Sequence, residues 1–211
     1  MSLVNIWIGD TQALVAVDTA GYGRHGAMEC SKFLPLPHAN MLFAGRGNLD
    51  FMRTLHTLAH TNGDDLDSAE AAMADRLVSV LKEFQRLIKA DRMEHLADPD
   101  GQEVHLVGWS AKRARMVALA YAIKYYGTVN QVEVSSIICC PWDAAAMGEK
   151  PVGRADVDPV QQLLETARAQ VAHYKPALPR PTIGGRLLVA DIRAASGSRP
   201  ASMAFFEAGT L

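Results

Sequence analysis

The stretch Ser2–Thr19, which reads SLVNIWIGDTQALVAVDT, decides the fold. Its first part, Leu3–Gly9, is rich in β-branched and aromatic residues, which favours a β-strand. Residues 9–12 supply turn chemistry, and Ala13–Val17 is an unbroken apolar segment. Because near-continuous apolarity is typical of strands that are buried on both faces, we predict a hairpin inside a sheet that is covered on both sides.

The rest of the chain alternates between blocks of strands and blocks of helices. After a glycine-rich loop over Ala20–Gly26, we predict strands over Cys30–Leu36, Ala39–Gly45, Glu103–Trp109, Ala114–Ala122, Val132–Cys140, Arg186–Arg193 and Ala201–Phe206. Helices are predicted over Leu49–His60, from Asp67 to a point before Asp98, and over Pro159–Tyr174. Such blocks indicate an α+β protein with sheets in the middle and helices outside, rather than a regular βαβ succession.

The helix that follows Asp67 has the clearest pattern. Its apolar stripe has helical spacing and consists of Leu77, Leu81, Phe84 and Ile88. Glu70 stands three residues after Asp67, as in a capping box, so we predict Asp67 as the N-cap.

Length and composition favour one compact domain over residues 1–211. The chain has 49% hydrophobic and 21% charged residues with a net charge of −2, and this balance argues against binding to nucleic acid or to an anionic membrane. The longest apolar run, Met116–Ile123, is far shorter than the roughly 20 residues of a spanning helix. With no signal segment and three cysteines that form no paired framework, we expect a cytoplasmic protein.

Ser2 is a candidate nucleophile, because an initiator methionine is normally removed before a small residue. The freed α-amine has a reference pKa of about 7.7–8.0 and could accept the hydroxyl proton itself. This chemistry needs a cation near the amine, a carboxylate that orients the cation, and backbone N–H donors for an oxyanion. Lys32, Asp18 and the pair Gly45 and Gly47 stand at strand ends where they could supply these groups.

Residues 2–50 resemble the start of proteasome β-subunits and of the peptidase subunits of bacterial ATP-dependent proteases, which are N-terminal nucleophile (Ntn) hydrolases. The resemblance rests on LVAVDT at 14–19, SKF at 31–33, FAGRGNLD at 43–50 and a gapless interval from Ser2 to Asp18. It implies the four-layer αββα sandwich of this family. Ser2 would be the nucleophile, Asp18 would orient Lys32, and Gly45 or Gly47 would bind the oxyanion. Residues 183–185, Ile-Gly-Gly, are similar to the family's entry into a late hairpin.

The resemblance also implies a function: a threonine/serine-type peptidase that acts on peptides or small amides as a homo-oligomeric ring. It requires no cofactor and no metal. The chain has no phosphate-loop signature, so unfolding of a protein substrate would need a separate ATPase. An amidase with a closed pocket for a small molecule is a weaker alternative.

Two departures from the family pattern support a different function. The family's supporting serine and aspartate are replaced by Cys139–Asp143 and by Pro179–Thr182. These losses favour the alternative of a non-catalytic subunit that serves as a structural or assembly protein.

The histidines and cysteines show no strong metal-binding pattern in the sequence. His56 and His60 lie four residues apart, but no third ligand stands near, so a helix-surface pair is the preferred interpretation. His105 is isolated in the sequence. Cys139 and Cys140 are neighbours in a predicted strand, where they point to opposite faces, so we do not expect them to bind one metal together.

Overall fold

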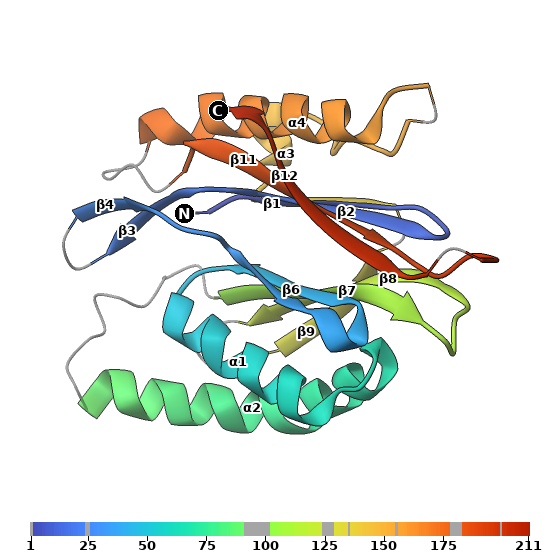
Figure 1. The fold of residues 1–211 in the computed structure, drawn as a ribbon. Coiled ribbons are helices and arrows are strands. Elements are labelled where there is room, and N and C mark those ends of the chain that lie inside the picture. The colour runs from blue at the N-terminus through green and yellow to red at the C-terminus, as the bar shows by residue number, and fades with distance from the viewer. Residues whose placement is uncertain are drawn as a thin grey trace.

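The computed structural model describes residues 2–23, 26–90, 102–123, 129–134, 136–154, 156–177, 183–198 and 200–211 (Figure 1). The elements in chain order are β1 (Val4–Ile8), β2 (Gln12–Asp18), β3 (Ala20–Gly23), β4 (Gly26–Glu29), β5 (Phe33–Leu36), the 3-10 helix η1 (Pro37–Ala39), β6 (Met41–Arg46), α1 (Leu49–Asn62), α2 (Leu66–Ala90), β7 (Gln102–Ser110), β8 (Arg115–Ile123), β9 (Val129–Val134), β10 (Ile137–Cys140), α3 (Ala144–Met147), α4 (Pro159–Tyr174), the 3-10 helix η3 (Lys175–Ala177), β11 (Arg186–Arg193) and β12 (Ser202–Thr210).

Two five-stranded antiparallel sheets form the centre of the molecule. Their strand orders are β10-β1-β2-β11-β12 and β5-β6-β7-β8-β9, and β3 pairs with β4 in a separate two-stranded ribbon. The predicted hairpin is confirmed, because β1 and β2 pair from Val4 opposite Val17 to Ile8 opposite Ala13. Both strands lie inside their sheet and are almost entirely buried.

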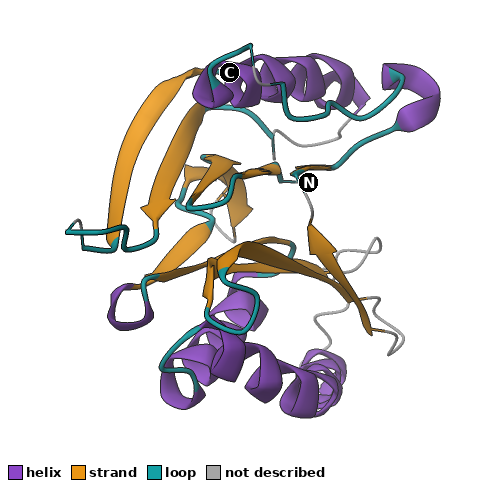
Figure 2. Ribbon diagram, turned by 90° about the vertical axis from the view of Figure 1, so that its right-hand side faces the viewer, coloured by secondary structure: helices purple, strands orange, loops and turns teal. Residues whose placement is uncertain are grey.

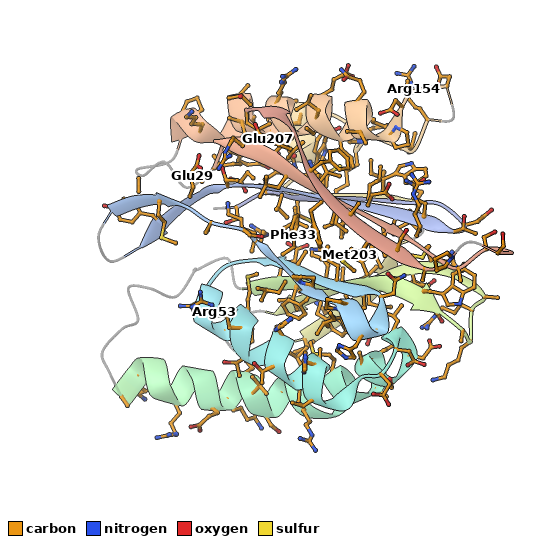
Figure 3. All side chains as sticks on the ribbon, in the orientation of Figure 1. Glu29, Phe33, Arg53, Arg154, Met203 and Glu207 are labelled. Carbon is orange, nitrogen blue, oxygen red and sulfur yellow. The ribbon has the colours of Figure 1, made fainter. Side chains whose placement is uncertain are left out.

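Alternation along the strands divides the apolar side chains between separate cores. On β6, Leu42 and Ala44 belong to the cluster between the two sheets, whereas Met41 and Phe43 belong to the cluster beneath helices α1 and α2. Phe33 of β5 belongs to the core between the sheets and Met203 of β12 packs against it; both are labelled in Figure 3.

Helices cover the outer faces of both sheets (Figure 2). Helix α4 places Leu163 and Val171 in one cluster with Leu14 and Ala16 of β2. On the other side, α1 and α2 bury apolar side chains against β6, β7 and β8; those with no exposed surface include Phe51, Leu55, Met73, Phe43 and Leu106. None of the helices in the described part of the chain is both long enough and apolar enough to cross a membrane.

Several predicted elements differ from the structure. The glycine-rich segment predicted as a loop forms part of the β3–β4 ribbon, in which Ala20 pairs with Glu29. The stretch Val132–Cys140 is not one strand, because β9 and β10 belong to different sheets. Ser136 lies at the crossing, and its carbonyl accepts a hydrogen bond from the Ile8 amide.

The start of helix α2 also corrects a prediction. Asp65, rather than Asp67, has the capping-box contacts: its Oδ1 accepts from the Ser68 amide at 2.8 Å, and its own amide donates to Ser68 Oγ. Asp67 instead accepts from Ser110 Oγ at 2.6 Å and ties the helix to the turn between β7 and β8. The predicted stripe is buried at Leu77 and Leu81, while the side chains of Phe84 and Ile88 lie outside the described set.

Gly45 permits the close packing of β6 against β7. A Cβ at this position would lie 2.7 Å from the Glu103 carbonyl oxygen, a backbone atom that cannot move without disturbing the strand pairing. We therefore expect Gly45→Ala to lower the free energy of unfolding by about 1–3 kcal/mol, measured by urea denaturation. In the matched variant Gly153→Ala the new Cβ lies 3.5 Å from Trp7 Nε1, so its effect should stay within about 0.5 kcal/mol. Equal stabilities for the two variants would contradict the packing argument.

Candidate active site

A buried ion pair joins the two sheets at one end. Asp18 is the last residue of β2 in one sheet, and Lys32 immediately precedes β5 in the other. Lys32 Nζ donates to Asp18 Oδ1 at 2.5 Å and to the Ala20 carbonyl at 2.5 Å. Asp18 has no exposed surface and Lys32 is 5% exposed. The fold therefore brings together two residues that the sequence separates by 14 positions.

The start of the chain is held against this pair. The Leu3 amide donates to Asp18 Oδ1 at 2.8 Å, the same oxygen that accepts from Lys32. Ser2, the preceding residue, is half-buried. The hydrogen bond from Leu3 to Asp18 therefore places the Asp18–Lys32 pair next to the start of the chain, as the sequence predicts.

The second carboxylate oxygen of Asp18 also has a hydrogen-bond partner. The Gly184 amide donates to Asp18 Oδ2 at 2.9 Å. Gly184 and Gly185 have φ of +117° and +81°, a region that side chains rarely adopt, and a Cβ on Gly185 would lie 2.5 Å from Thr19 Oγ1. The sequence indicated these glycines as the entry to a hairpin. It did not reveal the hydrogen bond from Gly184 to Asp18, because that bond depends on the pairing of β11 with β2.

Burial opposes the charged form of each group in the ion pair, while the pairing itself favours both charged forms. Burial lowers the pKa of Lys32 against the opposing charge of Asp18. It also raises the pKa of Asp18, against the Lys32 charge and the hydrogen bonds from Lys32, Leu3 and Gly184. The two groups are in direct contact, with 2.5 Å between Lys32 Nζ and Asp18 Oδ1.

Arg186 fixes the β3–β4 ribbon next to this end of the sheet. Its guanidinium bridges Glu29 of β4 at 2.6 Å and Glu207 of β12 at 3.3 Å; both glutamates are labelled in Figure 3. The Arg186 carbonyl also accepts from the Thr19 amide, directly after Asp18.

The two candidate oxyanion glycines have different environments. The Gly45 amide donates to the Lys32 carbonyl at 3.1 Å, which closes the pairing of β5 with β6. Gly47 follows the end of β6, is exposed, and has a φ of +114°. The sequence left the choice between the two open; in the structure the Gly45 N–H takes part in strand pairing, whereas Gly47 lies exposed beyond the end of β6.

The segment Cys139–Asp143, which departs from the family pattern, contains structural groups. Asp143 caps the short helix α3 through its carboxylate, and Cys139 and Cys140 are buried. Residues 179–182, which replace the supporting aspartate, lie outside the described residues. His56 and His60 are ring neighbours with centroids 6.3 Å apart.

Sequence reasoning missed one cluster of chemically capable side chains. Within the described ranges, Glu103, His105 and Cys140 form a group whose ligand atoms all lie within 4.8 Å of one another. They come from β7 and β10, which belong to different sheets. The spacing of two residues between Glu103 and His105 was the available signal, but nothing in the sequence pairs them with Cys140.

Comparison with known proteins shows similarity in structure alone. No protein-family model matches the chain, and no curated protein matches it. Among solved structures, the chain is similar to the Anbu (Gly-1) mutant from Hyphomicrobium sp. strain MC1, with a TM-score of 0.61 and 11% sequence identity. The similarity covers 99% of this chain and 88% of the Anbu chain.

This result corrects the family suggested by the sequence. The chain resembles proteasome β-subunits and bacterial ATP-dependent peptidase subunits in residues 2–50, but the assignment to that family is wrong, because the similar structure is Anbu and no family model matches. At this level of identity the similarity shows the fold alone, so the chain shares the fold of that Anbu structure.

Removing one partner of the buried pair should destabilise the protein strongly. Lys32→Met leaves the Asp18 carboxylate buried without its cation, so we expect the free energy of unfolding to fall by about 3–5 kcal/mol. Asp18→Asn combined with Lys32→Met should lose less than the sum of the single losses. Urea denaturation measures all three, with the exposed Lys112→Met as a control that should change stability by about 0.5 kcal/mol or less. Additive losses would show that the pair does not couple.

Proposed function

We propose that the chain is an amide hydrolase of the Ntn type, with Ser2 as its nucleophile once the initiator methionine is removed. The observation that supports this best is the shared acceptor: Asp18 Oδ1 takes hydrogen bonds from both Lys32 and the Leu3 amide. A buried lysine held beside the second residue of the mature chain is what an N-terminal base requires.

The proposed reaction uses the α-amine of Ser2 as both base and acid. The amine takes the proton from Ser2 Oγ as the oxygen attacks the amide carbonyl, and then gives the proton to the departing amine. Water, activated by the same amine, hydrolyses the resulting ester and releases Ser2. The positive charge of Lys32 lowers the pKa of the α-amine, and Asp18 holds Lys32 in place. The Gly47 N–H is the proposed oxyanion donor, since the Gly45 N–H donates to Lys32.

The architecture and assembly are part of the same proposal. We interpret the order of α4, two sheets, and α1 with α2 as the four-layer αββα sandwich, formed by one domain over residues 1–211. The substrate is a peptide or small amide, and the active form is a homo-oligomeric ring. A separate ATPase stays a prediction from the sequence.

A second candidate is a non-catalytic subunit of the same fold. Two observations favour it: the Gly45 amide is engaged by Lys32, and the segment Cys139–Asp143 contains no supporting serine. In this case the buried pair would serve only to join the sheets.

Ser2→Ala tests the nucleophile. The natively encoded protein should lose Met1 and gain one adduct at Ser2 with a serine-reactive electrophile, seen by intact mass and peptide mapping. Ser2→Ala should show no adduct and hydrolyse a peptide-amide reporter about a thousandfold more slowly or worse. The exposed Ser198→Ala is the matched control and should behave like the parent protein. Retained Met1, or no adduct at Ser2, would favour the non-catalytic subunit, and a variant that hydrolyses as fast as an active parent would remove Ser2 from the reaction.

The oligomer proposal has its own measurement. Sedimentation or light scattering should give a mass several times the 22.9 kDa of one chain. A species of 22.9 kDa at micromolar concentration would contradict the ring, whether or not Ser2 is reactive.

A further inference from the structure

Glu103, His105 and Cys140 converge from the two sheets. Glu103 and His105 are two residues apart on β7 and therefore share the face that looks towards the other sheet, where Val107 joins the core between the sheets. Cys140 ends β10, and its Sγ donates to Glu103 Oε1 at 2.8 Å. His105 Nε2 approaches the same Glu103 oxygen at 3.6 Å. One carboxylate oxygen thus faces both a sulfur and an imidazole nitrogen.

His105 is the unexplained member of the group. Its side chain has no exposed surface, and among the described residues neither Nδ1 nor Nε2 has a hydrogen-bond partner. The 3.6 Å approach to Glu103 is too long for a hydrogen bond. Leaving a buried polar group unpaired costs about 1–3 kcal/mol, so an imidazole in this state calls for a missing partner.

The pKa shifts of His105 and Cys140 favour neutral side chains in the metal-free protein. Burial lowers the pKa of His105 against the opposing charge of Glu103, which leaves the imidazole neutral with a free lone pair. Burial raises the pKa of the Cys140 thiol, and the Glu103 carboxylate raises it further. Without an added cation, the thiol therefore keeps its proton and donates it to Glu103.

We propose that Glu103 Oε1, His105 Nε2 and Cys140 Sγ bind a Zn²⁺ ion. One carboxylate oxygen, one imidazole nitrogen and one thiolate sulfur are ligands that zinc accepts in tetrahedral sites, at about 2.0–2.3 Å from the metal. Such distances require neighbouring ligand atoms to stand roughly 3–4 Å apart. The ligand atoms, all within 4.8 Å of one another, need only small shifts to reach that spacing.

Binding exchanges a proton for the metal. The Cys140 S–H bond breaks, the sulfur forms a bond to Zn²⁺, and the proton leaves to solvent. No electron is transferred. Three protein ligands leave the fourth position of a tetrahedral zinc ion for a water molecule.

Arg46 acts as the outer partner of this site. Its Nε donates to Glu103 Oε2 at 2.7 Å, so the carboxylate is oriented through one oxygen while the other faces Cys140 and His105. Hydrogen bonds of this kind hold metal ligands in place. Arg46 is also the residue between Gly45 and Gly47, and Cys140 pairs with Val4 near the chain start. The zinc site therefore lies at the same end of the sheets as the Ser2 site but does not depend on that proposal.

Titration with Co²⁺ and Zn²⁺ tests the proposal on chelator-treated full-length protein. Co²⁺ should produce the absorption of a cobalt–thiolate bond with one ion per chain, and Zn²⁺ should abolish it by competition. Cys140→Ser should remove the thiolate absorption. Cys140→Ser, His105→Gln and Glu103→Gln should each weaken Zn²⁺ binding by about 100-fold or more, since loss of an outer partner alone costs 10–100-fold.

Matched controls separate this site from other thiols and from the proposed nucleophile. Cys139→Ser alters the buried neighbour on the opposite face of β10 and should keep the parent affinity. Ser2→Ala should also keep it, so loss of hydrolysis and loss of metal binding are distinguishable. Absence of binding in the parent protein, or an unchanged Zn²⁺ affinity in Cys140→Ser, would overturn the proposal.

A second measurement covers the case in which the ligand variants fail to fold, as judged by circular dichroism. In the parent protein, Zn²⁺ should slow alkylation of Cys140 at least tenfold while Cys30, which is half-buried, reacts as before. Equal rates for Cys140 with and without Zn²⁺ would overturn the proposal.

Discussion

The contact between Lys32 and Asp18 is the interaction on which the rest of the structure depends. It is an ion pair with almost no exposure to water, and such pairs are stable only when further hydrogen bonds satisfy both partners. Leu3, Gly184 and the Ala20 carbonyl supply these bonds. One charged pair therefore fixes the chain start, the ends of two sheets and the late hairpin relative to one another.

The apolar layers explain why this pair can exist. Strands with alternating side chains fill one core between the sheets and two more beneath the helices, and these cores exclude water from the strand ends. In a medium of low dielectric constant, the attraction between Lys32 and Asp18 is stronger than at a surface. The same exclusion of water raises the pKa of Asp18 and lowers that of Lys32, against the effect of their mutual attraction.

A second cluster of polar side chains lies at the same end of the sheets, and it too is built from residues of both sheets. Glu103 and His105 come from one sheet and Cys140 comes from the other, while Arg46 holds Glu103 from the strand beside it. Each site thus combines strand ends from both sheets. In the first the charges are paired and satisfied; in the second the His105 imidazole has no partner among the described residues. That difference separates a site complete in itself from one that calls for an ion.

The sequence by itself determined the hairpin of β1 and β2, the helices and the candidates Asp18 and Lys32, because these rest on local patterns of apolarity and spacing. It misplaced the N-cap of α2 and merged β9 with β10, since short polar signals such as Asp65 and Ser136 act only in their three-dimensional surroundings. Only the tertiary structure decided that Gly45 and Gly47 differ, that Gly184 reaches Asp18, and that Cys140 meets Glu103 and His105. The physical reason is that these contacts join residues from different strands and sheets, and no local pattern records such a pairing.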